Sequence, residues 1–579
     1  MGNINVKKLM TYFIVTVLMV AFIYCIIGNY FLVKDTMNIQ DAMELTDSED
    51  FLVSLYGQYN AEEKEMASIY LKWWHHSAED MFYLFVPGDI PLYWKFTQVD
   101  SVLVDEQLVQ EADAFSLEEG MHLLRVDLGE EIKEYSFYVM YSSQINSLFL
   151  EIGSGSVEEI NSDKEIEETG KYALMTRSDL PNMTGGLISS IRGRGNASWI
   201  KTEKKSYQIE LETEANQADM GSAKKWLLIA NAFDATLMHN KMVFEMAEQL
   251  GLSFTPEAEF VDVYANGEYL GNYFLCEKIE VGEERVNIAD LETITQELNP
   301  NCKLKNFPTF IEEYGKIPEI KGYRVANNPE DITGGYILEL DIKKRYDLEE
   351  SGFTTAREQC VVIKNPKNPS YMQTAYIAEK YQEFEDALFT TDGINPYTGK
   401  SYSDYIDVES FVRKYLLEEV TKNLDSAFTS QFFYKPQDSV SDLLYAGPVW
   451  DYDKSMGYKG APEPEGLYAN RAIEGTDMWG EIYPHENLWH ALYQHDDYKE
   501  KVIEIYNQEL RKIILNETES EIGHRAELLM DSAMMNAVRW ELLSDSDLIE
   551  NKKIAYQSAV QSLEEFLIAR IEYLDQIWK

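Results

Sequence analysis

Two aspartates two residues apart are the first residues in this chain whose types and spacing suggest chemistry. Asp451 and Asp453 follow the apolar run 443–446 and a Gly447-Pro448 turn. In an extended backbone residues i and i+2 share a face, so both carboxylates would point to the same side. A pair of carboxylates at a strand end suits Mg²⁺, which prefers one or two protein carboxylates together with phosphate oxygens and water. A turn in which the two side chains cap backbone amides explains the same pattern.

A third carboxylate, Asp425, is brought to this region by the elements predicted around it. It follows a helix predicted over residues 405–424. The next strand, 431–435, pairs with the strand that enters the Asp451 turn. Asp425 and Asp451 therefore lie at opposite ends of one hairpin.

A glycine-containing segment further upstream could bind phosphate. It reads Arg192, Gly193, Arg194, Gly195, Asn196. Glycines let a ligand approach the backbone closely, and exposed amides together with two arginines can hold phosphate oxygens. An ordinary glycine-containing hairpin with two solvated arginines would show the same residue pattern.

The strand predicted over residues 205–211 carries a lysine near that segment. By alternation Lys205 shares the apolar face of this strand with Tyr207 and Ile209. Lys204 points the other way, unless a bulge intervenes. The sequence leaves open which of the two contacts a ligand.

Two acidic residues lie on the elements that follow. Glu245 belongs to a helix predicted over residues 234–250, where apolar residues recur at helical spacing and a glycine follows as the C-cap. Two strands then flank Asn266-Gly267, a strong hairpin signal. Glu277 ends the second of these strands.

Length and composition set limits on the class of protein. The chain has 579 residues and a formal net charge of −49, from 51 basic and 100 acidic residues. At this length we expect two or more domains. No basic block offsets the charge, so binding to nucleic acid or to an anionic lipid surface is disfavoured. The four cysteines have no paired spacing, which argues against a disulfide framework or a zinc site.

The N-terminal region predicts a membrane anchor. Residues 9–33 are uncharged, apolar and long enough to cross a bilayer as a helix. Lys7 and Lys8 precede them, so the positive-inside rule keeps the N-terminus cytoplasmic and the large domain extracytoplasmic. A cleaved signal peptide is the alternative, but no small-x-small cleavage site follows the apolar stretch. We expect a single-pass protein of the cell membrane, with residues 1–34 forming the cytoplasmic tip and the anchor.

The remaining chain divides by composition. Residues 35–68 are polar and acidic with modest helical periodicity, and are expected to form a stalk or a docking segment. Short β-rich runs separated by turns predict a small all-β sandwich over residues 69–143, of the immunoglobulin-like sort. Residues 144–579 form the large α+β domain.

Six motifs occur in one order along the large domain: RGRGNASW, KKSY, ANGEYLGNYFLCEKI, GGYILELD, NLDSAFTSQFFYKP and GPVWDYDKSMG. Together they resemble the spore-coat protein H (CotH) kinase family, over roughly residues 145–579. Members of that family are atypical kinases with a bilobal protein-kinase-like fold. They transfer the γ-phosphate of ATP, with Mg²⁺ or Mn²⁺, to Ser or Thr of protein substrates. The β-rich segment is similar to the sandwich that precedes such domains in some bacterial members.

The resemblance implies a bilobal α+β domain and a nucleotide site. The Asn266-Gly267 hairpin would belong to the smaller lobe and helix 405–424 to the larger one. Residues 192–196 would cover the phosphates, and Lys205 or Lys204 would contact them. Glu245 would orient that lysine, and Glu277 would lie where a kinase hinge receives the nucleotide.

The resemblance also implies roles for the aspartates. Asp425 would accept or orient the proton of the substrate hydroxyl. Asp451 would bind the metal, with Asp453 as a candidate second ligand. Where the family commonly shows Asn, this chain has Gln431, whose amide oxygen lies one methylene further out. This departure from the family's pattern bears on the binding of a second metal and on turnover.

Two other functions fit parts of the pattern. A catalytically silent surface protein could use the same fold for binding, because fold alone does not confer activity. A glycosidase could use Asp451 and Asp453 as an acid/base pair, but carboxylates at i and i+2 lie closer than a sugar ring and its water require.

Overall fold

The computed structural model describes residues 53–57, 66–77, 80–88, 90–177, 182–459, 463–472, 475–476, 482–483, 487–544 and 548–579. The predicted membrane anchor, residues 9–33, lies outside these ranges. Within them, no helix is both long and apolar enough to span a bilayer.

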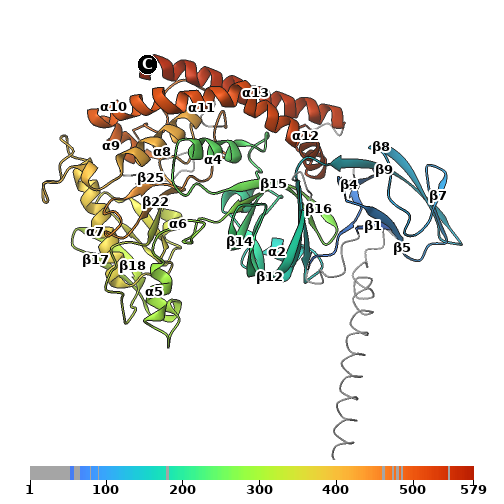
Figure 1. Cartoon of the computed structure of the whole chain (residues 1–579), viewed down its shortest axis with the longest axis horizontal. Helices are drawn as coiled ribbons and strands as arrows, with labels where there is room; N and C mark the ends of the chain where they lie inside the picture. Colours follow the sequence, from blue (N-terminus) through green and yellow to red (C-terminus); the bar gives the residue numbers. More distant parts are fainter. Residues whose placement is uncertain are drawn as a thin grey trace, which may run out of the picture.

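The first part of the described chain is a sandwich of two sheets (Figure 1). One sheet has the order β2 (Tyr70–Leu71), β1 (Val53–Gly57), β5 (Leu92–Phe96). The other has the order β3 (Trp74–His76), β4 (Met81–Pro87), β9 (Ile132–Ser142), β8 (Gly120–Asp127), β6 (Ser101–Val104), β7 (Gln107–Val109). Leu55, Leu84 and Trp94 are among its buried core residues.

Strand β1 differs from the sequence-based expectation. It lies within residues 35–68, for which a stalk or a docking helix was expected, yet Val53–Gly57 pairs along its length with β5. The reason is the local alternation, because Val53 and Leu55 are buried while Ser54 between them is partly exposed. A period of two fits a strand and not a helix.

A closed seven-stranded barrel follows. Its order is β10 (Asn146–Ile152), β11 (Glu167–Thr176), β12 (Asn182–Arg194), β13 (Ser206–Asn216), β14 (Ser222–Ile229), β16 (Glu268–Glu277), β15 (Ala258–Ala265), and β15 pairs with β10. The short helices α2 (Glu158–Ser162) and α3 (Ala197–Lys201) lie in its connections. Apolar side chains such as Ile191, Ile209, Trp226 and Leu275 fill the interior.

The β15–β16 hairpin confirms the turn predicted at Asn266-Gly267. The two residues have φ of 47° and 83°, the left-handed values that a tight two-residue hairpin turn needs. Between β14 and β15 the chain forms α4 (His239–Gln249). This helix starts later than predicted because Asp234 accepts from the backbone N–H groups of Thr236 and His239, both at 2.8 Å, and so closes a turn ahead of it.

A second, seven-stranded sheet builds the other half of the large domain. Its order is β17 (Thr309–Tyr314), β18 (Ile317–Tyr323), β20 (Gly352–Thr354), β21 (Cys360–Asn365), β19 (Tyr336–Leu340), β22 (Gln431–Lys435), β23 (Tyr445–Ala446). The helices associated with it are α5 (Leu291–Glu297), α6 (Lys343–Tyr346), α7 (Tyr371–Leu388) and α8 (Val408–Thr421). Helix α8 is shorter than predicted, because Asp407 caps its start and Lys422 ends it with φ of 47°.

Helices at the C-terminal end connect the parts. They are α9 (Leu488–Gln494), α10 (Asp496–Ile505), α11 (Arg511–Asn516), α12 (Ile522–Arg539) and α13 (Ile549–Trp578). Figure 1 shows α13 running along one side of the molecule, next to α10 and α11. Helix α12 contacts β9 of the sandwich and β16 of the barrel, so it joins the first two parts.

The barrel and the second sheet face each other around α4. The backbone N–H of Tyr452, which follows β23, donates to Asn240 Oδ1 of α4 at 2.8 Å. Residues 190–280 and 415–457 therefore meet, as the expectation of two facing lobes requires.

Candidate functional site

The β22–β23 hairpin brings Asp425 and Asp451 together. Phe433 pairs with Ala446 across the hairpin. Asp425 precedes the first strand and Asp451 follows the second, and these two chain ends of an antiparallel hairpin lie side by side. Two backbone bonds join the turns: Leu424 N–H donates to Lys454 O at 3.2 Å, and Met456 N–H donates to Thr421 O at 2.7 Å.

A buried glutamate of α8 fixes both turns. The Tyr452 hydroxyl donates to Glu418 Oε1 at 2.6 Å, and Asn423 Nδ2 donates to Oε2 at 3.0 Å. Glu418 is fully buried and forms an ion pair with Lys414 at 2.9 Å. One side chain therefore sets the position of Asp425 relative to Asp451.

The three aspartates share one polar site. Lys454 Nζ lies 3.6 Å from Asp425 Oδ2, and Ser430 Oγ donates to Asp451 Oδ2 at 3.1 Å. Burial raises the pKa of Asp425 to about 6, against the opposing effect of Lys454. Burial, with the charge of Asp451 next, raises the pKa of Asp453 well above its usual range. Carboxyl groups held close together are harder to ionise, because each negative charge disfavours the next.

Two of the expected metal ligands have unsatisfied oxygens. Asp453 Oδ1 and Gln431 Oε1 are buried, and the described residues supply neither with a hydrogen-bond donor. Gln431 Nε2 donates weakly to Thr429 O at 3.5 Å. Buried oxygens without a donor fit a hard cation. In the part of the chain that the structure describes, no group of three or more His, Cys, Asp or Glu side chains could hold a metal, so water and phosphate oxygens would have to complete its coordination.

Of the glycine-containing segment, Arg194 lies next to the Asp451 motif, over the ring of Trp450. Because Ile191 points into the barrel, Arg192 and Arg194 point outward by alternation. The Arg194 guanidinium lies 5.6 Å from the Trp450 ring centre. Burial lowers the pKa of Arg194, and the carboxylates of Asp451, Asp453 and Glu339 oppose that effect.

The other residues of this segment have local contacts. Arg192 forms ion pairs with Glu165 and Glu167 at 3.8 and 3.7 Å, on the outside of the barrel. Gly193 leaves room for the Trp199 ring, which a Cβ would meet at 2.4 Å. Gly195 has φ of 93°, and Asn196 is an exposed residue that precedes α3.

Both candidate lysines bind neighbouring protein groups. Lys204, expected on the face away from the apolar side, is the buried one of the two, and Lys205 is half-buried. Lys204 Nζ donates to Ala230 O at 2.9 Å, to Asn536 Oδ1 at 2.8 Å and to Asn272 O. Lys205 Nζ donates to the carbonyl oxygens of the α3 segment, Trp199 O at 2.7 Å and Thr202 O at 2.6 Å. Both ammonium groups therefore have structural partners: Lys204 joins the barrel to α12, and Lys205 holds the loop that contains α3.

Glu245 and Glu277 also pair away from the two lysines. Glu245 forms ion pairs with Lys241, at 3.4 Å, and with Arg525 of α12. Glu277 accepts from Arg285 and, at 3.0 Å, from the backbone N–H of Glu257. Burial raises the pKa of Glu277 to about 7.

The structure adds charged residues that sequence reasoning did not select. Lys454 stands inside the Asp451 motif and could have been chosen as its cation. Arg345 could not have been chosen from the sequence, because it is distant from the Asp425 turn along the chain and near it only in the folded structure. Its Nε lies 3.0 Å from Asp341, and Thr429 Oγ1 donates to the same carboxylate at 2.9 Å. Burial raises the pKa of Asp341 to about 6, with Glu339 contributing.

A known protein family matches the chain. The family model described as CotH kinase protein matches residues 191–574. These residues include all the candidate site residues and most of the large domain. No curated protein matches the chain.

Proposed function

The chain belongs to the CotH kinase family, which implies a phosphotransferase, and on this premise we propose that it transfers the γ-phosphate of ATP to Ser or Thr of a protein, with Mg²⁺ or Mn²⁺. The observation that carries this proposal is that the β22–β23 hairpin brings Asp425 and Asp451 together while Arg194 of the barrel lies over Trp450, the residue before Asp451. The two carboxylates come from the ends of one hairpin and the guanidinium from the barrel opposite.

The order of elements supports a kinase-like small lobe. In protein kinases a phosphate-covering loop is followed by a strand that carries a lysine and then by a helix that carries a glutamate. In this chain the loop between β12 and β13 is followed by β13, then by β14 and then by α4. The lysine of protein kinases lies on the third strand, which corresponds here to β14. By this order the lysine position falls on β14, where the half-buried Lys225 forms an ion pair with Glu280 at 3.6 Å, and not on Lys204 or Lys205.

The local charges support the division of roles. Phosphoryl transfer needs positioning and neutralisation of charge more than covalent help. Arg194 is the barrel residue that would bind phosphate oxygens, because one guanidinium group can donate two parallel hydrogen bonds to a phosphate. Asp451 and Asp453, with Gln431, would hold the metal, which when bound neutralises phosphate charge. Asp425, next to Lys454, would orient the acceptor hydroxyl and take its proton.

The apolar segment 9–33 supports an extracytoplasmic location for this activity. A single-pass anchor would put the large domain outside the membrane. The acceptor would then be a surface or extracytoplasmic protein.

The test uses purified full-length protein with labelled ATP and Mg²⁺ or Mn²⁺, and measures self-phosphorylation and nucleotide binding. We expect Asp451→Ala to weaken metal-dependent ATP binding and abolish transfer. Asp425→Ala should keep binding but lower the rate by a factor on the order of a hundred or more. Asp453→Ala should be milder than Asp451→Ala if Asp451 is the main ligand.

Asp496→Ala is the matched control, because this side chain is 94% exposed on α10. It should leave binding and transfer unchanged. Full transfer by both Asp425→Ala and Asp451→Ala would refute the proposal. So would a wild-type protein without metal-dependent nucleotide binding, which would favour the catalytically silent binding protein.

A further inference from the structure

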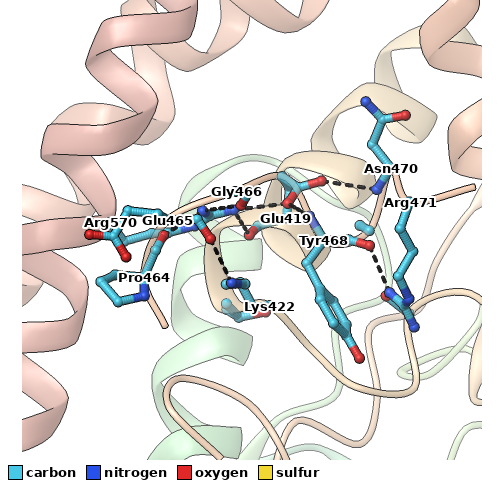
Figure 2. A network of polar contacts seen from close by, with 12 residues as sticks. Glu419, Lys422, Pro464, Glu465, Gly466, Tyr468, Asn470, Arg471 and Arg570 are labelled. Atoms are coloured by element: carbon cyan, nitrogen blue, oxygen red, sulfur yellow. Dashed lines mark hydrogen bonds and ion pairs between the residues drawn. The ribbon is translucent and has the colours of Figure 1, made fainter. Parts of the chain in front are cut away.

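A buried ion pair lies beside the segment that follows the Asp451 motif. Glu419 of α8 and Arg570 of α13 are both fully buried, and Arg570 Nη2 lies 2.8 Å from Glu419 Oε1. Such a pair is costly to desolvate unless further hydrogen bonds satisfy both groups. Figure 2 shows where these bonds go: to residues 463–471, called the strap below.

The strap is bound along its length by side chains of α8 and α13. Arg570 Nη1 donates to Pro464 O at 2.6 Å and to Gly466 O at 2.7 Å. The backbone N–H of Asn470 donates to Glu419 Oε2 at 3.0 Å, and that of Tyr468 donates to Oε1. Lys422 Nζ donates to Glu465 O at 2.8 Å and to Glu463 O. The conformation of the strap therefore depends on these three side chains.

The strap ends at Arg471, whose guanidinium is fixed by stacking. It lies 3.7 Å from the centre of the Tyr468 ring and 5.2 Å from that of Phe428. Arg471 Nη1 also donates to Tyr468 O at 2.7 Å. An arginine held in this way loses little conformational entropy when it binds a neighbour.

The neighbours of this guanidinium are the residues on either side of Asp425. Arg471 Nη2 donates weakly to Leu424 O and Nη1 to Ser426 Oγ, each at 3.5 Å. The start of α9 holds the same two segments together. Asn487 Nδ2 donates to Arg471 O at 3.1 Å, and Trp489 Nε1 donates to Ser426 O at 2.7 Å.

We propose that Arg471 is a positioning residue for Asp425 in the transfer step, and that the strap, seated on the Glu419–Arg570 pair, holds Arg471 in place. This inference rests on the proposed kinase function. Arg471 acts through the turn 424–426 and through its charge, and not by touching the nucleotide.

The effect of the Arg471 charge on Asp425 depends on the other charges that surround this carboxyl. The charged groups are Lys454, Arg345 and Arg471 on the cationic side, and Asp451 and Asp453 on the anionic side; the hydroxyls of Tyr458 and Tyr468 also face it. A cation near a carboxyl favours its ionised form. Loss of Arg471 should therefore make Asp425 harder to ionise.

The test compares Arg471→Gln and Arg471→Lys in the full-length protein. For Arg471→Gln we expect kcat to fall by a factor on the order of ten and the acid limb of the kcat–pH profile to move to higher pH, while KM for ATP stays unchanged. Arg471→Lys should restore much of the position of the acid limb, because it keeps the charge. A merely structural role would lower kcat equally at all pH values.

The strap is tested by Arg570→Met, with Lys422→Met as the second variant should the first not fold. Either should speed amide hydrogen exchange in residues 463–471 and lower kcat. Because the strap acts through Arg471, the double variant with Arg471→Gln should be no slower than Arg471→Gln alone.

Two results would overturn the inference while leaving the kinase function intact. One is an Arg471→Gln protein with the kcat and pH profile of the wild type. The other is a double variant in which the two effects on kcat multiply. Absence of transfer in the wild type would instead refute the kinase function itself.

Discussion

Lys454 and Asp425 form a buried ion pair, with Nζ 3.6 Å from Oδ2, next to the backbone bond from Leu424 N–H to Lys454 O. Burial raises the pKa of Asp425 to about 6, Lys454 lowers it and Asp451 raises it. The lysine therefore favours the ionised form of Asp425, against burial and the charge of Asp451.

The first prediction concerns pH. If Asp425 must be ionised to take the hydroxyl proton, transfer should fall as the pH drops through about 6, where this carboxyl becomes protonated. Lys454→Met removes the opposing cation, so the acid limb of kcat should move to higher pH by about one unit or more. The exposed Lys512→Met on α11 is the control and should leave the profile unchanged. An unmoved limb in Lys454→Met would separate Asp425 from proton transfer.

The second prediction concerns the metal. Gln431 Oε1 is buried without a donor, so Gln431→Leu should raise the Mn²⁺ concentration needed for half-maximal activity by a factor on the order of ten. Gln431→Asn supplies the amide that the family commonly shows at this position, so it should need less Mn²⁺ than Gln431→Leu. Metal titrations of ATP binding measure both. Equal metal dependence in all three proteins would remove Gln431 from the site.

The hairpin that carries the site was predictable because its signals are local. Strand 431–435 is apolar and matches β22, and it pairs with the strand ahead of Asp451 as expected. Helix α7 has the predicted bounds, since Ser370 and Gln373 form a capping box at its start. Residue types and short spacing settle such features.

The surroundings of the site were not predictable because they depend on distant residues. Lys204 is buried against Asn536, which is 332 positions away in the sequence. Likewise Arg570 binds the strap from α13, more than a hundred residues later. Alternation within the strand 205–211 could not reveal that α12 would cover Lys204. Assigning a catalytic role to either lysine therefore needed the tertiary structure.

The third prediction concerns the anchor. Residues 9–33 are apolar and follow two lysines, so deleting residues 1–34 should move the protein from the membrane fraction to the soluble fraction. In intact cells, added protease should degrade residues 60–579 of the full-length protein. A truncated protein that stays in the membrane fraction, or protection of the large domain from protease, would contradict this topology.

The last prediction separates structural from ligand-binding cations. Lys204→Met leaves three buried acceptors without their donor, at a cost of about 3 kcal/mol in the free energy of unfolding. Its folded fraction should still bind ATP, because the ammonium group holds the barrel to α12.

Arg194→Met should have the opposite pair of effects. It removes the cation that stacks on Trp450 and interacts with the charges of Asp451 and Asp453. Nucleotide affinity should therefore fall by a factor on the order of ten, with little loss of stability. Urea unfolding and ATP titration of the same preparations measure both effects. Loss of ATP binding in a fully folded Lys204→Met protein would return that lysine to the nucleotide site.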